Sequence, residues 1–382
     1  MIGAGEDEVK MAAALIGAAR RITIKIGSSL IIDQAGTGAR REWMASVGDD
    51  VAALRTQGKQ VLLVSSGSVA LGRKHLGLKR SQRLAYKQAA AAAGQALLMQ
   101  AWEAALAPHG IPTAQLLLTI EDTEQRRRWL NARATLDVLL SQGALPVINE
   151  NDSVATEELR YGDNDRLSAR AAQMIRSDLL ILLSDVDGLY TADPASEPDA
   201  SHIPYVEEVD ARVEGVATGP ARGGVGSGGM RTKLIAARIA ANFGCATLIA
   251  SGHANGPISR LMEGAKATII AAKGSPASAY KQWIAGALAP AGRVSIDKGA
   301  LAALASGKSL LPAGVTGVAG NFDRGVCLSI LDESGTEIAR GITAYNAAEA
   351  LAILGCNSDM IVERLGYSGP DELIHRDDMV ML

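Results

Sequence analysis

The chain has 382 residues, a length at which one hydrophobic core usually stops growing, so we expect two domains. Hydrophobic residues make up 48% and charged residues 21%, and no apolar stretch approaches the ~20 residues that a membrane helix needs, so we expect a globular protein outside the membrane. The formal net charge of -3 excludes a global attraction to nucleic acid or to an anionic membrane, so any phosphate-binding site must be local.

The cysteines and the first residues indicate the compartment. Cys245, Cys327 and Cys356 lie far apart and form no CxxC pair, which argues against a disulfide framework and a zinc site. We therefore expect a reducing, cytoplasmic environment. Residues 1–20 contain Glu6, Asp7 and Glu8 ahead of a short Ala-rich run, unlike a secretory signal, so we interpret them as an N-terminal extension and expect a frayed helical tail.

Strands and helices alternate along residues 21–255. The expected strands are 22–27, 61–64, 114–118, 144–148, 179–184 and 245–250. Helices are expected up to about residue 57, over 81–106, over 121–141 and from about residue 230. Short apolar strands are typical of a parallel sheet that is buried on both faces, so the pattern predicts an αβα sandwich whose ligands lie beyond the carboxyl ends of the strands.

The pattern changes after about residue 254, where a Gly/Pro/Ala-rich stretch leads to short strand signals at 293–297 and 326–331. We predict a boundary between the two domains there. The expected ranges are a first domain over 21–255, a linker over 256–290, a small β-rich domain over 291–372 and a tail over 373–382.

The strongest polar cluster is VINENDSVATEELRYGDNDRLSA, residues 147–169, which follows directly on an expected strand. It brings together amides and carboxylates that include Asn149, Asp152, Asn164 and Asp165. One alternative is structural, because Asn and Asp favour turns and helix caps, and Asp163 or Asn164 would then only cap the next helix.

Two lysines lie at glycine-rich turns. The segment GVGSGGMRTK, 224–233, opens a helix, where backbone N–H groups can approach a polyphosphate, although Lys233 is followed by Leu234 and the Walker A spacing is absent. Lys25 is a lone cation in an apolar strand before the 27–29 turn. The alternative for the glycine-rich segment is a flexible surface loop, and the alternative for Lys25 is a side chain that snorkels to solvent. Together, two cations at two such turns suit phosphoryl transfer, which needs positive groups on the transferred oxygens.

In this order, the motifs KxGSS, SSGSVALGR, NARATLD, VINENDSVAT, GDNDRLSA, LLSDVDGLYTADP and GGMRTK resemble those of the glutamate 5-kinases, which have the amino acid kinase fold. The segments AGRVSIDKGALAAL, GNFDRGV and HRDDMV resemble the PUA domain that follows the kinase domain in many of these enzymes. The resemblance implies ATP-dependent phosphorylation of the side-chain carboxylate of L-glutamate to L-glutamyl 5-phosphate, the first step of proline biosynthesis.

The resemblance also implies roles for single residues. Catalysis is assigned to Lys25, Lys233 and Asp165, and glutamate binding to Ser66, Asp152, Asn164 and Asn149. Nucleotide binding is assigned to Lys25, Ser184, Asp185, Ser227, Gly228, Gly229, Met230, Arg231, Thr232 and Lys233. Where the family often reads TGGM, this chain has SGGM from Ser227 on, which is a conservative departure.

Cofactors and partners follow from the same resemblance, which implies ATP with Mg²⁺, proline as a candidate feedback inhibitor and a homo-oligomer. One alternative is another kinase of this fold, for acetylglutamate or a phosphonate, whose substrate would leave Asp152 without an ammonium partner. The other is an RNA-binding protein, since PUA domains in other proteins bind RNA. Residues 290–382 carry seven Lys and Arg against twelve Asp and Glu, the wrong sign for RNA, so we expect neither RNA nor membrane as a partner.

Overall fold

The computed structural model describes residues 4–33, 38–81, 83–154, 164–194, 196–216, 229–287 and 289–382. The chain divides into two compact units, Met1–Pro276 and Ala277–Leu382. Each unit has its own sheet and its own hydrophobic core.

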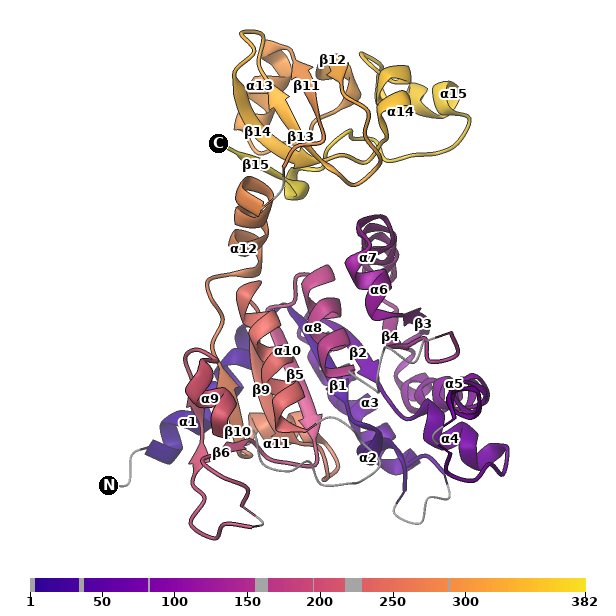
Figure 1. Cartoon of the computed structure of the whole chain (residues 1–382), viewed down its shortest axis with the longest axis vertical. Helices are drawn as coiled ribbons and strands as arrows, with labels where there is room; N and C mark the ends of the chain where they lie inside the picture. Colours follow the sequence, from indigo (N-terminus) through magenta and orange to yellow (C-terminus); the bar gives the residue numbers. More distant parts are fainter. Residues whose placement is uncertain are drawn as a thin grey trace. The chain divides into compact units, whose positions relative to one another are not determined.

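Among the described residues, the N-terminal unit is built on one eight-stranded sheet in the order β3-β4-β2-β1-β5-β9-β10-β8 (Figure 1). These strands are β1 (Arg21–Ile26), β2 (Gln60–Ser65), β3 (Thr113–Leu118), β4 (Leu145–Glu150), β5 (Leu179–Ser184), β8 (Tyr205–Val206), β9 (Ala246–Ser251) and β10 (Ala267–Ile270). Neighbours from β3 to β9 run parallel, and β10 runs antiparallel to β9. The predicted mostly parallel sheet is therefore confirmed. β6 (Leu189–Tyr190) and β7 (His202–Ile203) form a separate ladder.

Helices cover both faces of this sheet (Figure 1). They are α1 (Ala4–Ala18), α2 (Ser28–Ile31), α3 (Arg41–Thr56), α4 (Ser68–His75), α5 (Leu84–Leu106), η1 (Ala107–His109), α6 (Ile120–Glu124), α7 (Arg126–Ser141), α8 (Asn164–Met174), α9 (Ala211–Val216), α10 (Met230–Asn242) and α11 (Pro257–Met262). One layer packs α3 against α5 and α11, and the other packs α8 against α10. No helix in the described part of the chain is long and apolar enough to cross a membrane.

The two helical layers explain why the central strands are apolar at nearly every position. Alternate side chains of β5 enter different cores, so a slip of one residue in its register would place each side chain in the wrong core. Leu179, Ile181 and Leu183 join the core with α1, α3 and α5. Leu180 and Leu182 join the core with α8 and α10.

The same alternation orients Lys25 of β1. Ile22, Ile24 and Ile26 join the core with α1, α3 and α5. Successive side chains of a strand point to opposite faces of the sheet. Lys25 therefore lies on the side of α8 and α10.

The N-terminal extension is part of the fold. Ile16 of α1 is fully buried in the core with α3 and α5. The ammonium group of Lys59, itself buried, donates hydrogen bonds to the carbonyl oxygens of Gly17 at 2.6 Å and Ala19 at 2.8 Å. Carbonyls at a helix end lack partners within the helix, so this lysine satisfies them. The prediction of a frayed tail is wrong for this end of α1.

Residues that were expected to form a linker extend the N-terminal unit instead. Within 256–290, α11 and β10 add a helix and a strand to this unit, and Ile258 and Ile269 lie in its core. Asp50 of α3 fixes the start of α11, because its carboxylate accepts hydrogen bonds from the backbone N–H groups of Ile258 at 2.8 Å and Ser259 at 3.1 Å. The two units meet in the sequence after Pro276.

The C-terminal unit is β-rich, as predicted, with a five-stranded sheet in the order β12-β11-β13-β14-β15. Its strands are β11 (Gly292–Ile296), β12 (Val315–Ala319), β13 (Cys327–Leu331), β14 (Glu337–Ile342) and β15 (Met379–Met381). Its helical segments are α12 (Pro276–Gln282), which begins at the boundary, η2 (Trp283–Ala287), α13 (Lys298–Ala305), η3 (Pro312–Gly314), α14 (Ala347–Ala352), η4 (Ser358–Met360), α15 (Ile361–Leu365) and η5 (Arg376–Asp378). The expected tail, 373–382, contains β15, which pairs with β14.

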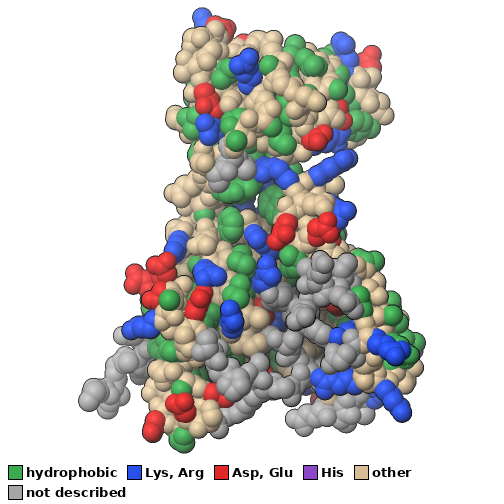
Figure 2. Space-filling model, viewed as in Figure 1, with side chains coloured by type: hydrophobic (Ala, Val, Ile, Leu, Met, Phe, Trp, Pro, Cys, Tyr) green, Lys and Arg blue, Asp and Glu red, His purple; other side chains and the backbone are tan. Residues whose placement is uncertain are grey.

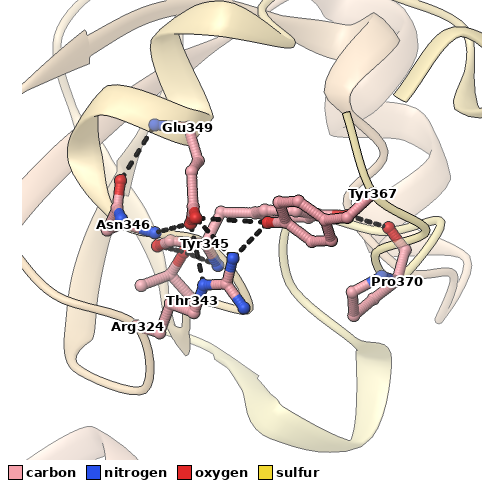
Figure 3. Close-up of polar contacts among 7 residues, drawn as sticks. All are labelled: Arg324, Thr343, Tyr345, Asn346, Glu349, Tyr367 and Pro370. Atoms are coloured by element: carbon pink, nitrogen blue, oxygen red, sulfur yellow. Dashed lines mark hydrogen bonds and ion pairs between the residues drawn. The ribbon is translucent and has the colours of Figure 1, made fainter. Parts of the chain in front are cut away.

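A polar cluster ties the start of α14 to the chain around Tyr367 (Figure 3). The guanidinium group of Arg324 donates to the Glu349 carboxylate, with 2.8 Å between Nε and Oε2, and to the Tyr367 hydroxyl. The hydroxyl of Tyr345 donates to the Pro370 carbonyl. Glu349 also takes part in the capping box that begins α14. Its carboxylate therefore both caps this helix and accepts hydrogen bonds from Arg324.

Positive charge gathers on one part of the N-terminal unit, and Figure 2 shows Lys and Arg side chains over α4 and α5. Residues 73–87 contain no Asp or Glu, and their cations are Arg73, Lys74, Lys79, Arg80, Arg83 and Lys87. A net charge of -3 for the chain thus conceals a local positive potential, which attracts anions to this region.

The contact of Lys59 with the end of α1 yields a stability prediction. Lys59→Met keeps the apolar stem but removes hydrogen bonds from a charged donor, so we expect the free energy of unfolding to fall by roughly 1 to 3 kcal/mol. Urea unfolding followed by the fluorescence of the buried Trp43 and Trp102 measures the loss. Lys74→Met, at an exposed position, is the control, and an equal effect in both variants would contradict the role of Lys59.

Candidate active site

A buried group of three charges lies where β1, α8 and α10 meet. Asp165 in the first turn of α8 is 1% exposed, and its Oδ1 lies 2.6 Å from Nζ of Lys25 on β1. Its Oδ2 lies 3.4 Å from Nζ of Lys233, in the first turn of α10. The sequence predicted these three residues as a set, and the structure brings them together.

Local structure explains this convergence. Lys25 points toward the layer of α8 and α10 because its neighbours in β1 point the other way. Gly229 is the N-cap of α10 and, having no side chain, does not cap the backbone N–H groups of the first turn. Helix N-termini carry a partial positive charge, so the start of α10 favours an anion beside Lys233.

The electrostatics of the three charges are dominated by burial and by their mutual attraction. Burial alone would raise the pKa of Asp165, but Lys25 and Lys233 hold that pKa well below its usual range. Burial lowers the pKa of Lys233, and the charges of Asp165 and Asp185 oppose that shift. Two ammonium groups against one carboxylate leave one net positive charge, which suits the oxygens of a phosphoryl group.

An amide cluster adjoins the three charges, since Asn164 precedes Asp165 in the chain. Nδ2 of Asn164 donates to Oγ of Ser66 at 2.6 Å and to Oδ1 of Asn149 at 3.0 Å. Nδ2 of Asn149 donates to Oγ of Ser68 at 3.1 Å and to Oε1 of Gln95 at 2.9 Å. The cluster thus joins the ends of β2 and β4 to the start of α8 and to α5.

Sequence reasoning named three members of this cluster, Ser66, Asn149 and Asn164, and missed Ser68 and Gln95. The signal for Gln95 was present, because it is the one polar side chain in the run AAAAAGQALL, 89–98. An amide among alanines on the buried side of a helix needs hydrogen-bond partners. The local sequence pattern does not identify the hydrogen-bond partners of Gln95.

The turn after β2 depends on a glycine. Gly67 has a φ of +112°, in the region that L side chains rarely adopt, and it lies between Ser66 and Ser68. A Cβ at this position would also lie 3.0 Å from a methyl group of Ile31. The glycine therefore allows both serine hydroxyls to reach the amide cluster.

Asp152 lies in the turn directly after β4 and is half-buried. Burial raises its pKa to about 6. Within the described part of the chain, its carboxylate has no hydrogen bond or ion pair. It is therefore an acceptor available to a ligand, but one whose charge depends on pH near neutrality.

The expected nucleotide-binding residues lie at two strand and helix ends. Ser184 ends β5, and its Oγ donates to Oδ1 of the exposed Asp185 at 2.8 Å. Thr232 in α10 donates to Oδ2 of Asp165 at 2.7 Å, which adds it to the group of three charges. Met230 and Arg231 open α10 beside it. Ser227 and Gly228 lie outside the described residues.

Comparisons with known proteins identify the family of the chain. The model of the amino acid kinase family matches residues 20–251, and that of the PUA domain matches residues 292–365. A glutamate 5-kinase of Caulobacter vibrioides is 57% identical over 367 residues, which cover 95% of this chain and 97% of that protein. A glutamate 5-kinase of Brucella ovis is 53% identical over 363 residues, 95% of this chain and 96% of that protein.

Among solved structures, a UMP kinase from Ureaplasma parvum matches with a TM-score of 0.45 and 17% identity, over 66% of this chain and 98% of that chain. The two relatives, in contrast, match nearly the full length of the chain at more than half of the aligned positions. This chain therefore belongs to the amino acid kinase family and, within it, to the glutamate 5-kinases that carry a PUA domain.

Proposed function

We propose that the chain transfers the γ-phosphoryl group of ATP to the side-chain carboxylate of L-glutamate and forms L-glutamyl 5-phosphate, the first step of proline biosynthesis. The observation that carries this proposal is the buried group of Lys25, Asp165 and Lys233 beside an amide cluster. The group of three charges suits a phosphoryl group, and the amide cluster suits a small polar substrate.

The chemistry requires alignment and charge neutralisation rather than a base. The γ-carboxylate of glutamate is already ionised at pH 7, so one of its oxygens attacks the γ-phosphorus while the bond to the bridging oxygen breaks and ADP leaves. Lys25 and Lys233 neutralise charge on the transferred oxygens. Asp165 holds both ammonium groups in position and is not consumed.

The nucleotide is proposed to bind along the ends of β5 and α10. Backbone N–H groups of the first turn of α10 are donors for phosphate oxygens, and residues 227–233 precede and form that turn. Ser184 and Asp185 at the end of β5 are proposed to line the same site. The interaction of Asp185 with the charge of Lys233 supports its proximity.

Mg²⁺ is proposed to enter with the nucleotide. Among the described residues, no group of three or more His, Cys, Asp and Glu side chains could hold a metal ion. Mg²⁺ in kinases is commonly held by substrate phosphates, waters and only one or two carboxylates. Both oxygens of Asp165 already contact lysine or threonine, so the donor set fits an ion that ATP carries better than one held in a protein cage.

Glutamate is proposed to bind at the amide cluster. Asp152 and Oδ1 of Asn164 are acceptors for its ammonium group, and Ser66 and Asn149 fix the position of Asn164. Proline also carries an ammonium nitrogen beside a carboxylate, which supports it as a feedback inhibitor. A cytoplasmic location and a homo-oligomer complete the proposal.

Removing either ammonium group should slow the chemical step. We expect Lys25→Ala and Lys233→Ala each to lower kcat by roughly a hundredfold or more, the scale for the loss of one preorganised charge stabiliser. ADP release in a coupled assay measures kcat, and circular dichroism checks the fold. Exposed Lys74→Ala should keep kcat, and a folded Lys25 or Lys233 variant with normal kcat would refute the assignment.

The pKa of Asp152 predicts a pH dependence. Its carboxylate must be ionised to attract the substrate ammonium group, so kcat/KM for glutamate should fall as the pH drops below about 6. At saturating ATP, free glutamate has no group with a pKa between about 5 and 7. Asp152→Asn should raise the glutamate KM and remove this acidic limb, and an unchanged limb in that variant would assign it to another group.

The C-terminal unit should be dispensable for catalysis. All residues with a proposed role lie between Lys25 and Lys233, and the unit that ends at Pro276 has its own core. A chain that ends at Pro276 is therefore expected to keep glutamate-dependent ADP release. A folded truncation without phosphoryl transfer would show that the C-terminal unit supports the active site.

A further inference from the structure

We propose that Thr232 is a positioning residue whose hydroxyl occupies one oxygen of Asp165 and so keeps the ammonium group of Lys233 available to the transferred phosphoryl group. This inference rests on the proposed function. Thr232 and Lys233 are neighbours in the first turn of α10, and Asp165 lies in the first turn of α8, the helix that packs against α10.

The two carboxylate oxygens of Asp165 have different partners. Among the described residues, Oδ1 has one partner, Nζ of Lys25 at 2.6 Å. Oδ2 has two partners, Oγ1 of Thr232 at 2.7 Å and Nζ of Lys233 at 3.4 Å. A hydrogen bond from an ammonium group to a carboxylate is usually about 2.7 to 2.9 Å long. The ammonium group of Lys25 is therefore in close contact with Asp165, whereas that of Lys233 is held farther away.

The chemistry of Asp165 fixes the direction of the threonine hydrogen bond. Lys25 and Lys233 hold the pKa of Asp165 well below its usual range, so the carboxylate is ionised and can only accept. The same hydroxyl lies 2.8 Å from the carbonyl oxygen of Gly229, which already accepts the backbone N–H of Thr232 at 3.1 Å. A charged acceptor forms the stronger hydrogen bond, so the hydroxyl hydrogen points to Asp165.

A comparison of the two oxygens indicates what the hydroxyl does. Asp165 is 1% exposed, so protein groups must satisfy both of its oxygens. At Oδ1 an ammonium group does so alone and lies in close contact. At Oδ2 the short hydrogen bond from Thr232 satisfies the oxygen, and the ammonium group of Lys233 remains at the longer distance. Without the hydroxyl, Oδ2 would draw Lys233 into the same close contact as Lys25.

The longer distance matters for catalysis. The attraction between two charges falls as their separation grows, so an ammonium group held farther from a carboxylate gives up less when it turns to a phosphoryl oxygen. Lys233 also lies in the first turn of a helix, where the N-terminus favours anions. The backbone of this turn is thus left for the nucleotide, while the side chain of Thr232 serves Asp165.

Substitutions in the full chain test the proposal. Thr232→Val keeps the volume and the branched Cβ but removes the hydroxyl, and Thr232→Ser keeps the hydroxyl. Thr56→Val is the matched control, because Thr56 is an exposed helical threonine whose hydroxyl donates to the carbonyl oxygen of Ala53, three residues earlier, at 2.8 Å. ADP release in the coupled assay gives kcat and the KM values for ATP and glutamate, and circular dichroism checks the fold.

We expect Thr232→Val to lower kcat about tenfold, the scale for the loss of a hydrogen bond to a charged group, and both KM values to stay within about twofold. Thr232→Ser should restore kcat to within about twofold of the wild-type value, and Thr56→Val should change neither kcat nor KM. A folded Thr232→Val variant with normal kcat overturns the inference. A raised KM for ATP at normal kcat would instead place the hydroxyl on the nucleotide.

A double substitution tests whether Thr232 acts through Lys233. Lys233→Ala removes the ammonium group that the hydroxyl is inferred to keep available, so adding Thr232→Val should change the residual kcat by less than about twofold. A high enzyme concentration makes this residual ADP release measurable. A further tenfold loss in the Lys233→Ala background would show that the hydroxyl acts on another group, and it overturns the inference.

Thr232→Ser decides the question if Thr232→Val does not fold, because a loss of kcat in a folded variant that keeps the hydroxyl also overturns the inference. A wild-type chain that releases no ADP with glutamate overturns the proposed function and the inference with it. An active wild-type chain whose kcat is insensitive to the Thr232 hydroxyl overturns the inference alone.

Discussion

The buried carboxylate of Asp165, held between two ammonium groups, constrains the rest of the N-terminal unit. A buried charge without a partner is strongly destabilising, so the three charges must come together when the unit folds. Lys25 is fixed by β1 between β2 and β5, whereas Asp165 and Lys233 begin two helices that pack against each other. The pairing of the three charges therefore requires that α8 and α10 pack on the sheet in the correct register, and the same packing assembles the site.

Much of this arrangement could be predicted from the sequence because its causes are local. A strand buried on both faces is apolar at successive positions, and this pattern predicted β5. Lys25 was identified as a candidate because it is a cation within such an apolar strand. The polar residues after β4 pointed to one edge of the sheet, since parallel strands end at the same edge. Local pattern did not identify glutamate, and that expectation came from the family resemblance.

The features that were missed depend on contacts between distant segments. Burial of Ile16 depends on packing against a core that the rest of the chain supplies, so residues 1–20 looked like a tail. β10 joins the sheet antiparallel to β9, outside the alternation that identified β1 to β5 and β9. The hydrogen bond of Gln95 with Asn149 depends on the close approach of α4 and α5 at Gly72 and Gly94, whereas the local sequence shows only an alanine-rich run.

The site holds buried polar groups that have no hydrogen-bond partner among the described residues. An unpaired buried acceptor costs about 1 to 3 kcal/mol, and Oδ1 of Asn164 is such an atom. Burial likewise disfavours the charge of Asp152, as its raised pKa shows. In the proposed mode of glutamate binding, the ammonium group of the substrate pairs with both acceptors, so part of its binding free energy would come from relieving costs already present in the fold.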